Sequence, residues 1–203
     1  MSGAWFHGGM DDPERWFRRG GELADEGGVV EAEALALLSA AVAAGHGPAL
    51  VRMAEFLLHQ YSMADAASHA EALRLLREAV AADVPGARHV LGVALWDDGV
   101  LDEAEELLRT ALADGELDVH VNLAGLLHHK GDDAAAFALL RQAAERGDGP
   151  AYWIVMRLLP PAGQAAREVT MAYESATSPE ARPVCVLLTA GAWELEPSVL
   201  PVD

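Results

Sequence analysis

The sequence predicts an all-helical fold made of stacked helical hairpins. Three observations support this prediction: a repeated residue pattern, glycines that separate its apolar stretches, and a composition rich in small aliphatic residues. The pattern occurs twice within residues 85–147, and each residue of the first copy has a counterpart 32 positions later. The paired residues are Leu91 and Leu123, Gly92 and Ala124, Leu95 and Leu127, Gly99 and Gly131, Ala104 and Ala136, Leu108 and Leu140, and Ala111 and Ala143. A fixed period of this size is typical of helical repeats, in which each hairpin buries its apolar face against the next.

Each copy has the features of two helices joined by a short turn. Leu91 and Leu95 lie one turn apart and begin an apolar stripe on one side of a first helix. Gly99 can adopt the left-handed conformation that ends such a helix. Asp102 is expected to cap the second helix, and Glu105 completes a capping box three residues later.

The composition agrees with this pattern. Hydrophobic residues make up 52% of the chain, which is enough for a continuous core. Only 6% are aromatic, so alanine, leucine and valine supply most of that core and favour helices in close contact.

The residues of the two copies resemble the tetratricopeptide repeat and its SEL-type relative. Leu91-Gly92 and Leu95 match the first helix of that family, and the alanine, leucine and alanine at positions 104, 108 and 111 match its second helix. Arg88 and His120 stand where the family usually has an aromatic residue. The resemblance implies a right-handed α-solenoid of about five antiparallel helical hairpins followed by a C-terminal capping helix.

Two further hairpins are expected before the central copies. Residues 1–10 are rich in glycine and are expected to be loose. Asp12 and Pro13 predict the start of a helix that runs to Gly27, because aspartate suits the cap and proline the first turn. The Gly20-Gly21 pair inside this helix is expected either to kink it or to let a neighbouring helix come close. The second helix of this hairpin is expected over residues 31–44.

The next hairpin is expected over residues 49–59 and 69–82. Residues 60–68 between these helices form an insertion relative to the central copies. Insertions in solenoids lie at one edge, where they either contact a partner or are tolerated as surface loops.

The C-terminal part is expected to contain helices at residues 151–159, 162–174 and 183–195. Pro160 and Pro161 end the first of these helices. The last helix has few polar residues, so it is expected to cap the stack or to pack against another subunit. Residues 196–203 form a tail. No charged linker interrupts the chain, and residues 1–203 are therefore expected to form a single domain.

The charge balance limits the classes of partner. Fourteen basic residues stand against 32 acidic ones, which gives a net charge of −18. Such a field repels nucleic acids and anionic membranes and favours a basic protein partner, although it can equally reflect the proteome of the source organism. The single cysteine, Cys185, allows no internal disulfide and is expected to be a buried structural thiol. The N-terminal residues lack the pattern of a secretory signal and no stretch is long enough to span a membrane, so a cytoplasmic location is expected.

The candidate binding residues follow from the resemblance, which implies that partners lie against the first helices on the inner curve of the solenoid. The residues assigned to this surface are His59, His89, Val93, Trp96, Asp97, Asn122, His128, His129, Trp153 and Arg157, with Val121 and Gly125 beside them. His59, Trp96 and His128 occupy equivalent positions in successive units. Such a surface suits an extended peptide or an amphipathic helix. Alternatively, Trp96 and Trp153 fill gaps between repeats.

These observations favour a non-catalytic scaffold that binds a protein or peptide, without a cofactor. A first alternative is a self-assembling structural or regulatory subunit, with a homodimer formed through the terminal helices. A second alternative is a metal-binding sensor or enzyme that uses His59, His89, His128 and His129. No motif of a catalytic nucleophile or of a phosphate-binding loop is present.

Overall fold

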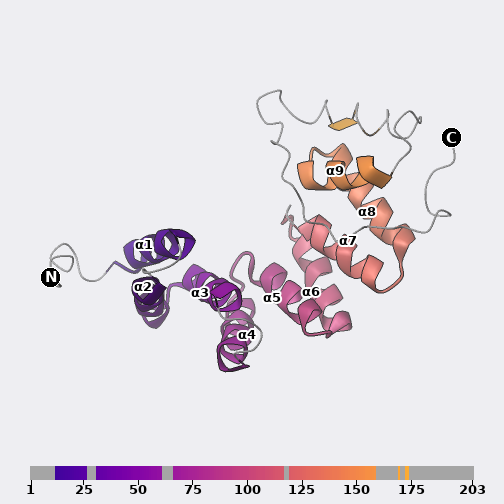
Figure 1. Cartoon of the computed structure of the whole chain (residues 1–203). Helices are drawn as coiled ribbons and strands as arrows, with labels where there is room; N and C mark the ends of the chain where they lie inside the picture. Colours follow the sequence, from indigo (N-terminus) through magenta and orange to yellow (C-terminus); the bar gives the residue numbers. More distant parts are fainter. Residues whose placement is uncertain are drawn as a thin grey trace. The chain divides into compact units, whose positions relative to one another are not determined.

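A computed structural model describes residues 12–26, 31–60, 66–116, 119–158, 169, 172 and 173. Over these residues the chain is helical and contains no strand, which confirms the predicted all-helical class (Figure 1). The helices are α1 (Pro13–Glu26), α2 (Glu31–Ala43), α3 (Gly47–Gln60), α4 (Ala66–Ala81), α5 (Ala87–Asp97), α6 (Leu101–Ala113), α7 (Val119–His129), α8 (Asp133–Glu145) and α9 (Gly149–Leu158). The chain divides into two compact units, Met1–Ala94 and Leu95–Asp203. The expectation of a single domain stays a prediction.

The first unit is built from consecutive helix pairs. Helix α1 packs on α2, α3 packs on α4, and α2 also contacts α3. Leu23, Ala34, Leu38 and Phe56 form a buried cluster among these helices. Packing of each helix against the next one along the chain is the arrangement that a helical repeat requires.

Helix α1 begins as its sequence predicts. The Asp12 side chain accepts hydrogen bonds from the backbone N–H groups of Glu14 and Arg15, at 3.1 and 3.4 Å, and Pro13 is the first helical residue. The Gly20-Gly21 pair lies within this one helix. A Cβ atom on Gly20 would lie 3.0 Å from Cγ of Leu38, so the missing side chain lets α2 come close. This is the second of the two roles expected for the pair.

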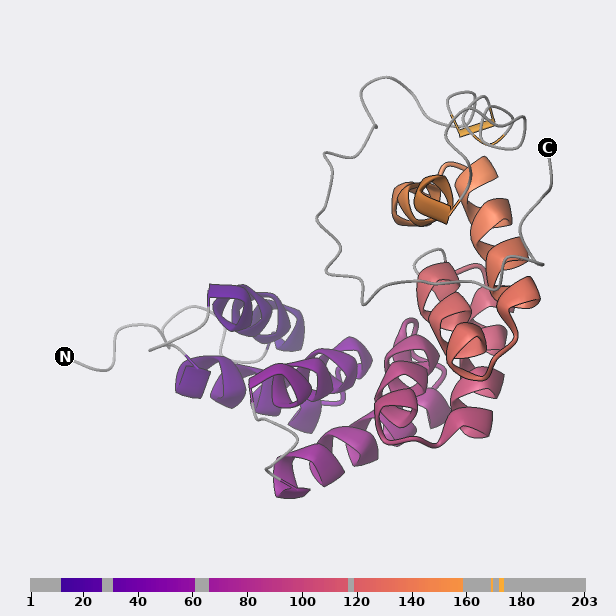
Figure 2. The same cartoon turned by 45° about the vertical axis from the view of Figure 1, so that its right-hand side comes forward.

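In the second unit, α6 packs on α7, α7 on α8, and α8 on α9, while α7 also contacts α9. Figures 1 and 2 both show α7 and α8 side by side. The positions that define the repeat form the core, as expected. The buried repeat residues of this unit are Leu95, Ala104, Leu108, Ala111, Leu123, Ala124, Leu127, Ala136, Leu140 and Ala143.

The turn glycines were predicted correctly, but one of the helix caps was not. Gly99 and Gly131 have φ angles of 78° and 83°, in the left-handed region. Asp102 does not cap α6, because the helix begins at Leu101 and the cap position is taken by Val100, which makes no side-chain cap bond. The backbone N–H of Val100 donates to the carbonyl of Leu95, at 2.8 Å, so the turn is too short for a cap at position 102.

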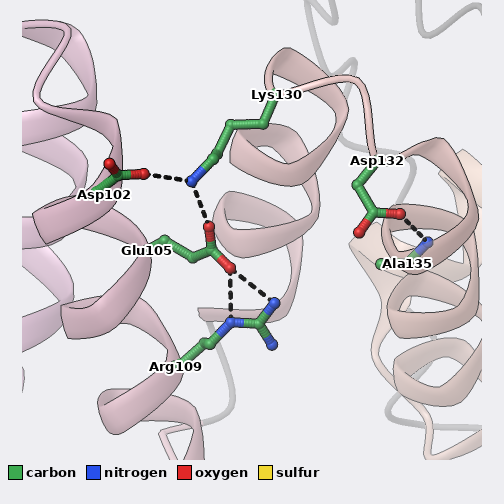
Figure 3. Close-up of polar contacts among 6 residues, drawn as sticks. All are labelled: Asp102, Glu105, Arg109, Lys130, Asp132 and Ala135. Atoms are coloured by element: carbon green, nitrogen blue, oxygen red, sulfur yellow. Dashed lines mark hydrogen bonds and ion pairs between the residues drawn. The ribbon is translucent and has the colours of Figure 1, made fainter.

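Asp132 occupies the corresponding cap position of the second copy. Its side chain accepts a hydrogen bond from the backbone N–H of Ala135, at 3.1 Å, and so caps α8 (Figure 3). The two copies therefore share a turn geometry but differ in the residue that caps the second helix.

Several predicted segments lie outside the described residues. These are residues 1–10, most of the insertion at residues 60–68, the helix at residues 183–195 and the tail at residues 196–203. Of the helix predicted at residues 162–174, the structure describes only residues 169, 172 and 173. Helix α4 begins at Ala66, three residues before the predicted start, so it includes the end of the insertion. In the parts that the structure describes, no helix is both long enough and apolar enough to cross a membrane.

Candidate binding surface

The ten predicted binding residues lie on the first helices of the pairs, namely α3, α5, α7 and α9, and none of the ten is fully buried, whereas Gly125 beside them is buried. His59, Asp97, His129, Trp153 and Arg157 are exposed, whereas His89, Val93, Trp96, Asn122 and His128 are half-buried. His59, His89 and Val93 belong to the first unit and the others to the second. The predicted alignment of His59 with Trp96 and His128 spans both units and stays a prediction.

Trp96 lies against α7. A Cβ atom built on Gly125 would lie 2.6 Å from Cη2 of Trp96 and 3.2 Å from Cζ3, so the indole covers the backbone at Gly125. The indole Nε1–H donates a hydrogen bond to Nδ1 of His129, at 2.8 Å, and the two rings are tilted by 56°. Trp96 therefore fills a gap between successive first helices while part of its side chain stays exposed.

The adjacent histidines at the end of α7 make opposite hydrogen bonds. Nδ1 of His128 lies 2.6 Å from Oδ1 of Asp133, the first residue of α8. An ionised carboxylate can only accept, so Nδ1 of His128 carries a proton in this geometry. An indole N–H can only donate, so Nδ1 of His129 carries none. The two imidazoles therefore have different chemical roles despite their adjacent positions.

Helix α9 presents an aromatic residue and a cation one turn apart. The Trp153 side chain is 41% exposed and packs edge-on against Tyr152, with ring centroids 5.3 Å apart. Tyr152 is stacked on Tyr173 at 4.1 Å, which fixes the ring that supports Trp153. Arg157 is exposed and forms no ion pair with any residue that the structure describes.

An ion network that the sequence did not reveal joins α6 to Lys130, the residue that directly follows α7 (Figure 3). Nζ of Lys130 lies 2.7 Å from Oδ1 of Asp102 and 2.7 Å from Oε2 of Glu105, and Glu105 also accepts a hydrogen bond from Nε of Arg109 at 2.8 Å. Hydrogen bonding to Lys130 lowers the pKa of both carboxyl groups, and these carboxylates raise the pKa of Lys130. The one sequence feature that pointed to Lys130 was composition, because it is the single lysine of the sequence.

A second set of polar contacts that the sequence did not reveal lies in the first unit. Arg52 on α3 donates to the Asp25 carboxylate and to the Gly21 carbonyl of α1, and also to Glu55 at 3.4 Å. His46 packs on the ring of Phe17, with centroids 4.7 Å apart. These contacts tie the start and the end of α1 to the α2–α3 region.

The metal-binding alternative needs several ligands around one point. Within the described ranges, no group of three or more His, Cys, Asp or Glu side chains is placed to hold a metal ion. Two of the histidines that this alternative would use, His128 and His129, already bind Asp133 and Trp96 through Nδ1.

The sequence matches no protein-family model and has no significant match among curated proteins. The resemblance to tetratricopeptide and SEL-type repeats therefore depends on the repeat residues themselves.

Proposed function

We propose that this chain is a non-catalytic scaffold of the tetratricopeptide or SEL-type kind, a right-handed α-solenoid whose first helices bind a protein or peptide segment. Two features support the proposal. The small and bulky positions of both central copies are buried, and consecutive helices from α6 to α9 contact each other, which stacked hairpins require. The residues assigned to the inner surface of the first helices stay at least partly exposed.

The observation that carries the proposal is the pair formed by Trp153 and Arg157 on α9. Tryptophan is usually largely buried, and tryptophan and arginine are the residues most enriched in the energetic centres of interfaces. Acidic residues outnumber basic ones by 32 to 14, yet Arg157 has no carboxylate partner among the described residues. By contrast, Arg109, Lys130 and Arg141 of the same unit all form ion pairs.

The geometry of α9 indicates what a bound segment must offer. Trp153 provides a rigid apolar surface, because Tyr152 already holds one side of its ring. Arg157 requires a carbonyl or carboxylate acceptor one helical turn away. The net charge of −18 attracts segments that are basic elsewhere along their length. We therefore infer a partner that is basic overall, with an apolar anchor beside one acceptor group.

The test uses the full chain as bait in affinity capture with chemical crosslinking. Wild type is compared with Trp153→Ala and Arg157→Ala, and Gln142→Ala, an exposed position on α8, is the matched control. We expect proteins captured by wild type and by the control to be lost from both α9 variants, with crosslinks that map to α7 or α9. Capture of the same proteins by all four chains would refute the assignment, provided that their circular dichroism spectra agree.

Self-assembly is the second candidate function, and the same exposed Trp153 favours it, because an exposed indole can bury itself against another copy of the chain. Light scattering over a range of concentrations tests this alternative. Self-association that Trp153→Ala abolishes would support it. A wild-type chain that stays monomeric at every concentration would rule it out.

A further inference from the structure

We propose that protonation of His129 releases Trp96 from its position over Gly125, so that the candidate binding surface of the second unit changes with pH. The conformational change depends only on the contacts among these three residues. Its consequence for partner binding rests on the function proposed above.

The first step of the argument is the direction of the Trp96–His129 hydrogen bond. The indole nitrogen has one hydrogen and no acceptor orbital, so it can only donate. At 2.8 Å, Nδ1 of His129 must therefore present a lone pair, with the ring proton on Nε2. The observed contact thus exists only for the neutral form of His129 in one of its two tautomers.

The second step is what protonation does to that contact. A protonated imidazole carries hydrogens on both nitrogens, so two N–H groups would then face each other. The ring centroids are 6.3 Å apart, beyond the roughly 6 Å over which a cation gains from the face of an aromatic ring. Protonation therefore replaces an attractive contact with a repulsive one. Histidine is the side chain that ordinarily changes charge between pH 5 and pH 8.

The charged groups linked to Trp96 and His129, as chain neighbours or through their contacts, come from α5, α6, α8 and the residue that follows α7. Asp97 follows Trp96 on α5, and Asp133 on α8 is bonded to His128. Lys130 follows His129 directly, but its charge is balanced by Asp102 and Glu105 of α6. The carboxylates outnumber the cation, so this end of α7 can accommodate a positive charge on His129. Protonation can then be met by movement of Trp96 while the helix pair stays folded.

The third step is what Trp96 uncovers. Gly125 has no side chain, and the indole lies where its Cβ would be. When Trp96 moves away, the bare backbone at Gly125 is exposed next to Val121 and His128 on the predicted binding side of α7. A partner that contacts Trp96 in its position over Gly125 therefore binds while His129 is neutral and is released when that ring is protonated.

The test follows the indole N–H signals of the full chain by ¹H–¹⁵N NMR from pH 8 to pH 5. The Trp96 signal is assigned as the one missing from Trp96→Phe. We expect it to shift and to exchange faster with water as the pH falls, with the same midpoint as the His129 ring. His129→Gln keeps an acceptor oxygen that does not titrate, so its Trp96 signal should not move. His128→Gln is the matched control and should titrate as wild type does.

Three results would overturn the proposal. The first is a Trp96 signal that is identical at pH 8 and pH 5 in wild type. The second is the same titration in His129→Gln. The third is simultaneous loss of all indole signals in wild type and His129→Gln, which would indicate global unfolding. Because these readouts need no partner, an unsuccessful capture experiment combined with the expected titration would contradict the proposed function alone.

Discussion

Replacing Gly125 with alanine tests whether Trp96 is packed as the structure shows. The new Cβ would lie 2.6 Å from Cη2 of Trp96, and ordinary contact begins at 3.4 Å, so the rigid indole must retreat by about 0.8 Å. A displacement of this size is enough to break the 2.8 Å bond to His129. The substitution therefore sets a local gain in helix propensity against a steric clash and a lost hydrogen bond.

The expected magnitude follows from these terms. Exchanging glycine for alanine inside a helix stabilises by about 0.8–1.0 kcal/mol. Overpacking costs about 1–3 kcal/mol, and the lost hydrogen bond costs a further 0.5–1.5 kcal/mol or so. We therefore expect Gly125→Ala to lower the free energy of unfolding by about 0.5–4 kcal/mol, whereas helix propensity alone predicts an increase.

The assay is urea unfolding followed by circular dichroism, with two matched comparisons. Gly21→Ala is the control, because its Cβ would lie 3.6 Å from the nearest side-chain atom, Nε of Arg52, and it should stabilise by about 0.5–1 kcal/mol. Gly125→Ala should also become stabilising when Trp96→Ala removes the obstructing ring. If Gly125→Ala stabilises the wild-type chain as Gly21→Ala does, the indole does not lie over α7 and the reasoning fails.

Three further predictions concern the capping residue and the ion network of the second unit. Asp132→Ala should lower the free energy of unfolding by about 1 kcal/mol, because it removes the cap of α8. Asp102→Ala should lower it by less, because Asp102 caps no helix. Urea unfolding measures both changes. Lys130→Met should lower stability only slightly, since Glu105 keeps its bond to Arg109, and a double-mutant cycle with Glu105→Gln measures the coupling. The stabilisation that Glu105 provides should be complete at neutral pH and lost as the pH falls through its lowered folded-state pKa. The free energy of unfolding should therefore fall less steeply with decreasing pH in Glu105→Gln than in wild type. An equal pH dependence in both chains would contradict this prediction.

The sequence was most informative where structure depends on residues close together in the chain. The 32-residue period correctly identified Ala104, Leu108 and Ala111 as core positions, because helical periodicity determines which side of a helix is buried. Asp12 was likewise recognised as a cap from its immediate neighbours. The Asp102 prediction was wrong because the start of α6 depends on where the preceding helix closes, at the Val100–Leu95 bond.

Contacts between distant residues were harder to predict. Lys130 binds carboxylates 25 and 28 residues earlier in the chain, and no local pattern specifies such a pairing. Trp96 and His129 are 33 residues apart, one position more than the repeat period. Superposing successive first helices by that period places the two residues close together. It does not predict their hydrogen bond, because that bond depends on the position of the indole over Gly125.

The ion network has a consequence for the covalent chemistry of this chain. Lys130 is its single lysine, so any amine-directed label, acyl group or isopeptide-linked tag that reacts with a side chain must react there. Acylation would neutralise the ammonium group that bridges two carboxylates, so Asp102 would lose its cation while Glu105 would keep only its bond to Arg109. Side-chain amine chemistry on this protein is therefore directed to the junction between α6 and α7.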